Sequence, residues 1–290
     1  MSLIGTLGSG VSALRTFMKG LEVIGNNIAN VNTTGYKSST AQYADSFSNI
    51  LQRSAPATAP ASNIPGISVG TGVKLIGVRT SFTQGSLEST GVPTDLGISG
   101  DGYFHVKNPV DGTEFATRDG TFRWDEQGYL TTAQGYHVQG GTGVGLATVA
   151  DIKLGTPPVG AELQSSTIDR GGNIIEFYSD GTSATNNKVL LQNFTDPSSL
   201  TKEGNNLYSS LISAGPVGAP AGTSLLQTTG INDPGTNGLG SVQSGTLELS
   251  NVDLTDQFAN LITTQRSFQA GSRLITVSDT VLDDIVNLKR

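Results

Sequence analysis

Apolar residues recur every seven positions near both ends of the chain, and most of the sequence lies between the two repeats. A seven-residue repeat brings an apolar side chain against a partner helix every two turns, as in a coiled coil. The pattern therefore predicts two terminal helices that pack on each other. The positions predicted to make this contact are Leu3, Leu7, Leu14, Phe17, Leu21, Ile24 and Ile28 near the start, and Leu254, Phe258, Leu261, Phe268, Ile275 and Leu282 near the end.

The first repeat has more apolar rows than one partner helix can cover. The predicted helix, residues 2 to 31, carries several such rows, one of which passes through Leu7, Leu14 and Leu21. We therefore expect neighbouring subunits to cover the remaining apolar surface. An amphipathic helix docked on its own domain is the alternative explanation, since such a helix also carries an apolar stripe.

The first predicted helix ends in a segment that is rich in asparagine. The helix-end motif comprises Asn26, Asn27, Asn30, Gly35 and Tyr36. Asparagine side chains compete for backbone hydrogen bonds and so weaken a helix, and Gly35 can adopt the left-handed conformation that often follows one. The asparagines could serve only to end the helix, or they could bond to a neighbouring subunit. The sequence leaves both explanations open.

Between the two helices, short β-rich segments alternate with turn signals. Asp-Gly pairs at 101–102, 111–112 and 119–120 indicate hairpins, because both residues tolerate a positive φ. Residues 53–69 contain no acid and are interrupted by prolines, which predicts an extended connector. Helix resumes after residue 250, where Asp253 can cap it.

These patterns predict a mixed, mainly β fold, in which a central all-β domain of short antiparallel strands is flanked by N- and C-terminal α-helices that pair as a coiled coil. Residues 1–34 and 250–290 would form the terminal helical domain. Residues 35–71 and 236–249 would be extended connectors, and residues 72–235 the β domain. Residues 140–165 are weakly patterned, so we expect a loop there, at a place where an additional outer domain could be inserted.

The composition of the chain favours some classes of function and argues against others. Charged residues make up 14% of the chain, well below the roughly 25% that is typical of soluble domains. Low charge suits surfaces that other copies of the protein will cover, because charges are costly to desolvate. A net charge of -7 argues against nucleic-acid binding, which requires a basic surface. The sequence has no cysteine, no apolar stretch of the ~20 residues that a membrane span needs, and no classical secretory signal at its start.

The sequence offers little catalytic chemistry. His105 and His137 lie in predicted β segments, and isolated histidines there are usually surface residues. Carboxylates cluster in the middle of the chain at Asp101, Asp119, Asp125 and Glu126. Most of these stand in turns, where Asp is favoured for backbone reasons. No spacing indicates metal ligands, so we expect no enzyme activity, no cofactor and no metal.

Several separate stretches resemble the bacterial flagellar rod and hook proteins. The terminal signatures are Gly25-Asn26-Asn27-Ile28-Ala29-Asn30 with Thr33-Thr34-Gly35-Tyr36-Lys37, and Ser244-Gly245-Thr246-Leu247-Glu248-Leu249-Ser250-Asn251-Val252-Asp253-Leu254 with Gln265-Arg266-Ser267-Phe268-Gln269. The stretches similar to the family's β domain are Asp95–Phe104, Thr117–Phe122 and Leu200–Tyr208. The resemblance covers most of the chain and keeps its order.

The resemblance implies a structural role. Members of this family are exported through the flagellar type III apparatus without a cleaved signal, and they stack into a helical tube. The main partner would therefore be the protein itself, with neighbouring rod, cap and hook–filament junction proteins at the ends of the tube. The paired terminal helices would line the central channel and the β domain would form the outer wall. Neither nucleic-acid binding nor membrane insertion is expected.

Within the family, the stretches Gly35–Ala41 and Tyr43–Phe47 are most similar to the hook protein. We therefore expect an extracellular hook subunit, whose tube transmits torque as a flexible joint and encloses the export channel. A periplasmic distal rod subunit of the basal body is the alternative, because such subunits have a similar length and an additional stretch near 53–69. A secreted carbohydrate-binding or adhesive β protein is a further alternative, but one tryptophan, Trp124, offers little for sugar stacking. A fibre built from three chains, with like ends paired, also remains open.

Overall fold

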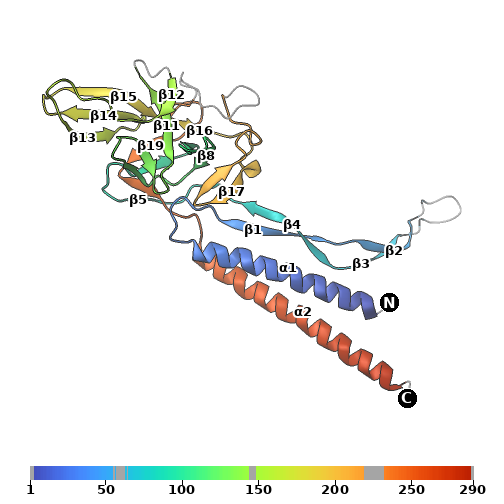
Figure 1. Ribbon diagram of the computed structural model, residues 1–290. Helices are drawn as coiled ribbons and strands as arrows, with labels where there is room; N and C mark the ends of the chain where they lie inside the picture. The colour runs from blue at the N-terminus through green and yellow to red at the C-terminus, as the bar shows by residue number, and fades with distance from the viewer. Residues whose placement is uncertain are drawn as a thin grey trace. The chain divides into compact units, whose positions relative to one another are not determined.

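Figure 1 shows the protein as a computed structural model that describes residues 3–54, 56, 63, 65–143, 148–218 and 232–288. Within this part the chain is mainly β, with one long helix near each end, and the strand pairs are antiparallel. The predicted mixed, mainly β fold class is therefore confirmed. The chain divides into two units. The helical unit comprises Met1–Ala29, Ser38–Ser81 and Val252–Arg290, and the β-rich unit comprises Asn30–Lys37 and Phe82–Asn251.

In the helical unit, α1 (Leu3–Ala29) and α2 (Leu254–Leu288) run side by side in opposite directions (Figure 1). Their register is constant along the pair. Asn27, Leu14 and Gly10 of α1 face, in that order, Gln257, Gly271 and Ile275 of α2. The two ends of the sequence therefore pack together inside one subunit. The interlocking side-chain geometry of a coiled coil stays a prediction.

Glycines let the two helices approach closely. A Cβ placed on Gly10 would lie 3.1 Å from Cγ1 of Ile275, and one on Gly271 would lie 3.4 Å from Cδ2 of Leu14. Helix α2 is capped as the sequence predicts, since Oδ1 of Asp253 accepts a hydrogen bond of 2.8 Å from the backbone N–H of residue 255.

Two antiparallel strand pairs complete the helical unit. Strand β1 (Ser39–Asp45) pairs with β4 (Val73–Thr80), and β2 (Ser48–Gln52) pairs with β3 (Ile67–Gly70). The sequence pattern assigns residues 72–80 to the β domain, whereas the ladder between β4 and β1 joins them to the helical unit. That ladder connects segments far apart in the sequence, so a local pattern does not reveal it.

The β-rich unit is built around one large antiparallel sheet. Its main row has the order β13-β14-β15-β11-β7-β8-β18-β17, and β9, β10, β12 and β16 pair with members of the row or with each other. Outside this sheet, β19 pairs with β6, and β20 pairs with β5. The elements are β5 (Leu87–Ser89), β6 (Leu96–Ser99), β7 (Tyr103–Lys107), β8 (Glu114–Thr117), β9 (Phe122–Trp124), β10 (Leu130–Thr132), β11 (His137–Thr142), β12 (Thr148–Asp151), β13 (Leu163–Ile168), β14 (Asn173–Tyr178), β15 (Ser183–Val189), β16 (Leu191–Gln192), the 3-10 helix η2 (Pro197–Ser199), β17 (Thr201–Gly204), β18 (Leu207–Ser209), β19 (Ser241–Ser244) and β20 (Thr246–Glu248).

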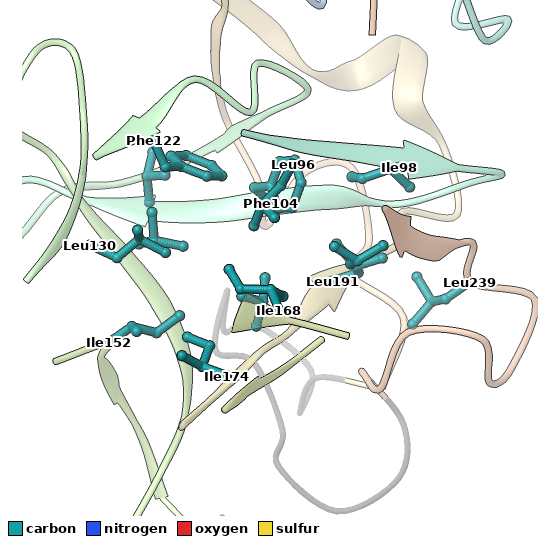
Figure 2. Packing of buried hydrophobic residues seen from close by; sticks show 14 of the residues in the cluster. Leu96, Ile98, Phe104, Phe122, Leu130, Ile152, Ile168, Ile174, Leu191 and Leu239 are labelled. Carbon is teal, nitrogen blue, oxygen red and sulfur yellow. The ribbon is translucent and has the colours of Figure 1, made fainter. Parts of the chain in front are cut away.

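Strand β7 is buried on both of its faces. On one face, Phe104 packs edge-on against Phe122 with 5.1 Å between ring centroids, inside the apolar cluster of Figure 2. Successive side chains of a strand point to opposite faces. Accordingly, Tyr103 lies in a second cluster, where its ring centroid is 5.4 Å from that of Phe194 and 6.0 Å from that of Tyr208. Apolar layers therefore cover the centre of the sheet from both sides.

The Asp-Gly pairs form hairpins in only some of the predicted places. Asp111-Gly112 joins the paired strands β7 and β8, with a glycine φ of 69°. Asp101-Gly102 and Asp119-Gly120 instead connect strands that do not pair with each other, β6 with β7 and β8 with β9, so the hairpin prediction is wrong there. At Gly120 the glycine serves close packing, because a Cβ would overlap the carbonyl oxygen of Leu96.

Residues 140–165 also differ from the predicted loop. They contain β12, the end of β11 and the start of β13, and β12 pairs with β11. A Cβ on Gly140 would overlap the carbonyl oxygen of Lys188, so this glycine reflects close contact between strands. Residues 144–147 of this segment and residues 219–231, which fall in the predicted β domain, lie outside the described residues.

Candidate functional site

The predicted packing positions of α1 face two partners inside the helical unit. Leu14 faces Gly271 of α2, whereas the ring of Phe17 packs edge-on against Tyr43 of β1 with centroids 6.1 Å apart. The positions that remain half-buried are Leu7, Leu14, Phe17, Leu21, Ile24 and Ile28. The side chain of Leu3 lies outside the described part of the structure. Helix α1 therefore keeps apolar surface open to a further partner.

Helix α2 is covered less than α1. Leu261, Phe268 and Ile275 are half-buried, and Ile275 lies against Gly10 of α1. The exposed apolar side chains, which we call the apolar surface of α2, are Leu254, Phe258, Ile262, Leu274, Val277, Val281, Leu282, Ile285, Val286 and Leu288. These ten exposed side chains form two groups along the helix, at 254–262 and 274–288, and so many on one helix favour contact with another chain.

A second exposed apolar surface lies on the strands of the helical unit. Its members are Tyr43, Phe47, Ile50, Leu51, Ile67, Ile76 and Val78. Every residue of β2 is exposed, and the side chain of Phe47 just before it is 84% exposed. We call the paired strands β2 and β3 the exposed ribbon. Because an isolated two-stranded hairpin is only marginally stable in water, we expect another chain to cover it. A groove of about 270 Å³, lined by residues of α1, β2 and β3, lies beside it.

The helix-end motif makes contacts inside the subunit that the sequence does not reveal. Nδ2 of Asn27 donates to the carbonyl oxygen of Ser39 at 2.7 Å and to Oε1 of Gln257 at 3.0 Å. The N–H of Ser39 returns a bond of 3.0 Å to Oδ1 of Asn27. No local signal points to Gln257, because its partner lies near the other end of the chain.

The other members of the motif have different surroundings. Asn26 is exposed on α1. In the β-rich unit, Oδ1 of Asn30 accepts a bond of 3.1 Å from Oγ1 of Thr33, and Gly35 has the predicted positive φ, 65°. Tyr36 is buried, which raises the pKa of its hydroxyl. These contacts agree with a role in ending the helix, and the intersubunit role stays a prediction.

Several of the groups considered for catalysis serve local structure. Oδ1 of Asp119 accepts from the backbone N–H of Thr121 at 3.2 Å, and Asp125 caps its own turn in the same way. His137 lies 2.7 Å from Asp151, measured from Nδ1 to Oδ2. Among the described residues, no group of His, Cys, Asp and Glu side chains could hold a metal ion. Neither helix, as far as the structure describes them, is long and apolar enough to cross a membrane.

Comparisons with known proteins agree at both ends and in the middle of the chain. The family described as "Flagella basal body rod protein" matches residues 7–37, "Flagellar hook protein FlgE/F/G D1 domain" matches residues 97–176, and "Flagellar basal body rod FlgEFG protein C-terminal" matches residues 243–288.

Relatives named as rod proteins match the whole chain, whereas a relative named as a hook protein matches about half of it. The flagellar basal-body rod protein FlgG of Bacillus subtilis is 36% identical over 99% of this chain and 100% of its own length, and that of Borreliella burgdorferi is 31% identical over 100% and 99%. The flagellar hook protein FlgE of Helicobacter mustelae is 43% identical, but over only 48% of this chain and 31% of its own length.

A β-rich unit between two terminal helices with uncovered apolar surfaces defines a structural subunit of an assembly. The chain belongs to the FlgE/F/G family of bacterial flagellar rod and hook proteins. The resemblance seen in the sequence is thereby confirmed at the level of the family. The protein is a structural component of the flagellum and not an enzyme, as the sequence predicts.

Proposed function

We propose that the protein is a distal rod subunit of the flagellar basal body. The observation that carries this proposal is the share of each relative's length that the chain matches. The chain matches rod proteins from end to end, whereas it matches 31% of the hook relative. The comparisons therefore favour the distal rod over the hook that the stretches Gly35–Ala41 and Tyr43–Phe47 suggested.

The segment between the strands supports the same choice. A longer hook subunit would carry an additional outer domain near residues 140–165. The described residues of this segment include β12 and parts of β11 and β13, and these strands all belong to the one large sheet. The exposed ribbon of β2 and β3 also fits a rod. Packing of these strands against a neighbouring subunit would hold that subunit in place and stiffen the tube.

We further propose the arrangement of the subunit in the tube. The terminal segments 1–34 and 250–290 would form the inner layer around the export channel, and segments 35–71 and 236–249 would be the connectors. The outer wall would be the β domain predicted at residues 72–235, except for residues 73–80, which pair with β1 in the helical unit. The predicted packing positions on α1 and α2 would then contact neighbouring copies. Contacts of this head-to-tail kind that do not close into a ring produce an open helical polymer. Export would use the type III apparatus without a cleaved signal, and neighbouring rod, cap and hook proteins would be further partners.

The position of the subunit in the flagellum tests the proposal. An epitope tag inserted after Val159, a fully exposed residue, can be located by gold-labelled antibody on isolated hook–basal bodies. Gold on the straight periplasmic rod supports the proposal, and gold along the curved hook contradicts it. The same tag in the hook protein of the same bacterium serves as the control for labelling of the hook.

A further inference from the structure

Three charged side chains are buried together in the β-rich unit. The exposed fractions are 1% for Lys37, 3% for Arg118 and 1% for Glu248. Nζ of Lys37 lies 2.6 Å from Oε1 of Glu248, and Nη1 of Arg118 lies 3.2 Å from Oε2. Apolar residues of the same size often stabilise a protein as well as a buried ion pair does. This Lys37–Arg118–Glu248 cluster therefore requires another explanation.

The cluster joins separate segments of the backbone. Nζ of Lys37 also donates to the carbonyl oxygen of Thr83 at 2.8 Å. Oε1 of Glu248 accepts from the N–H of Gly85 at 2.9 Å, and the carbonyl oxygen of Glu248 accepts from the N–H of Gly35 at 2.8 Å. The Lys37–Glu248 ion pair and the backbone of Glu248 thus connect residues 35–37, 83–85 and 248.

Arg118 anchors the same cluster to the sheet. Its Nη2 donates to the carbonyl oxygen of Gly100 at 3.0 Å, and its guanidinium lies 5.1 Å from the centre of the ring of Tyr103 in β7. A guanidinium over an aromatic face adds a cation–π attraction. A further link comes from Asn251, whose Nδ2 donates to the carbonyl oxygen of Thr83 at 3.0 Å.

The joined segments are those by which the chain enters and leaves the β-rich unit. The chain passes from one unit to the other after residues 29, 37, 81 and 251. Lys37 is the last residue before one crossing, Thr83 is the second residue after another, and Asn251 is the last residue before the final one. The remaining crossing leads into residues 30–37, which end at Lys37. A force carried along the chain between the units therefore enters the β-rich unit at these segments.

Buried charges hold the segments that enter and leave the β-rich unit in one position better than apolar packing would. Apolar contacts have no preferred direction, whereas charge-assisted hydrogen bonds set both distance and angle. Separating one partner leaves a buried charge without compensation, so loosened arrangements are strongly disfavoured. Burial lowers the pKa of Lys37, and the nearby Glu248 carboxylate opposes that shift, so Glu248 favours the charged form of Lys37.

We propose that the Lys37–Arg118–Glu248 cluster is a clamp that holds the chain crossings in fixed positions on the β-rich unit. Bending or twisting forces then reach the sheet through one locked junction instead of several flexible segments. The clamp is a property of the single subunit. Only its consequence for the stiffness of the tube rests on the proposed rod function.

Hydrogen exchange of the full-length, unassembled protein tests the clamp. The Glu248→Gln variant leaves Lys37 and Arg118 facing a neutral amide, while the amide oxygen can still accept from Gly85. Peptides that cover 35–38, 83–85 and 248–251 should exchange at least about tenfold faster than in the wild type. Exchange in β7 should stay unchanged, because its bonds to neighbouring strands are untouched.

A second variant and a control keep the test decisive. Lys37→Met removes the bond to Thr83 but leaves the ion pair between Glu248 and Arg118, so the variant retains part of the cluster if Glu248→Gln does not fold. The control is Lys19→Met, which breaks an exposed pair with Glu22 of 2.8 Å. Unchanged exchange at the crossings in the folded cluster variants overturns the proposal. An equal increase in β7 also overturns it, since that result indicates a general loss of stability.

Polymers of the same variants test the mechanical consequence. Tubes of Glu248→Gln or Lys37→Met subunits should be more curved in electron micrographs than wild-type or Lys19→Met tubes, with a shorter persistence length. Faster exchange in the monomer together with equally stiff tubes would overturn the mechanical role. A hook location of the tagged protein would overturn the rod function and leave the exchange result standing, so the two failures can be told apart.

Discussion

Asn27 of α1 and Gln257 of α2 are joined by a buried hydrogen bond of 3.0 Å, although 230 positions separate them in the sequence. Asn27 is 1% exposed and also shares two hydrogen bonds with the backbone of Ser39, at 2.7 and 3.0 Å. One asparagine thus fixes the register of the two helices and the position at which β1 begins. A polar residue in an apolar helix interface specifies register in this way at some loss of stability.

Replacing this asparagine by an apolar residue should weaken the helical unit. Asn27→Leu removes the bonds to Gln257 and Ser39, and each buried polar group that loses its partner costs about 1–3 kcal/mol. We expect a loss of this size in the free energy of unfolding, measured by urea titration with circular dichroism at 222 nm. The control is Asn260→Leu, at an exposed position of α2. An equal loss in the two variants would contradict the role of Asn27.

The close approach of the helices gives a second prediction. A Cβ on Gly10 would lie 3.1 Å from Cγ1 of Ile275, whereas a Cβ on Gly25 would have no neighbour within 4 Å. Adding a side chain where two helices are already in van der Waals contact lowers the free energy of unfolding by about 1–3 kcal/mol. Gly10→Val should therefore lower the free energy of unfolding by this amount relative to Gly25→Val, in the same urea titration. Both variants introduce the same side chain into the same helix, so helix propensity cancels in the comparison. Similar stability of the two would show that the helices do not pack as described.

The terminal helices were predictable because their signal is local. A seven-residue repeat is visible within a few turns, and the cap at Asp253 needs only the residues that follow it. The sheet depends on pairs distant in sequence, such as β1 with β4, and no short pattern identifies such partners. Lys37 stands inside a recognisable motif, but its burial follows from Glu248, 211 positions away. The local repeats therefore predicted the two helices and their apolar positions. The strands within 35–71 and 140–165, and the polar contacts between distant segments, could not be predicted in this way.

The titration of Tyr178 predicts a loss of stability in alkali. Burial and a hydrogen bond of 2.5 Å to Glu176 raise the pKa of Tyr178 to about 12. The ordinary value is about 10, so the folded protein holds this proton more tightly than the unfolded chain does. The stability that comes from this group is complete below pH ~10 and is lost as the pH rises towards ~12. Tyr178→Phe should therefore show a shallower fall in the free energy of unfolding over this range.

The comparison of slopes isolates Tyr178 from groups that act in the opposite direction. The pKa of Lys37 is lowered, chiefly by burial, so the unfolded chain binds this proton more readily and the contribution of Lys37 to stability increases as the pH rises. That contribution is the same in wild type and Tyr178→Phe and cancels between them. Tyr136→Phe, a change at a half-buried tyrosine in the same unit, is the control. Parallel curves for wild type and Tyr178→Phe would contradict the prediction.

The apolar surface of α2 should matter for assembly and not for folding. Phe258 and Ile262 lie one turn apart on the helix and are each 50% exposed. Burial of a large apolar side chain against a neighbouring copy contributes about 1.5–3 kcal/mol, and every 1.4 kcal/mol changes an equilibrium about tenfold. The double variant Phe258→Ser/Ile262→Ser should therefore raise the critical concentration for polymerisation by about tenfold or more, measured by sedimentation and negative-stain microscopy.

The control for assembly is an exposed apolar side chain of the β-rich unit, Val110, which is 87% exposed on the turn between β7 and β8. Val110→Ser removes a comparable exposed apolar group and should polymerise like the wild type. The unfolding transition of unassembled Phe258→Ser/Ile262→Ser should match that of the wild type, since neither side chain is buried within the subunit. If the double variant polymerised normally, the apolar surface of α2 would not be the contact between copies. The exposed ribbon of β2 and β3 would then be the surface to alter next, with Leu51→Ser.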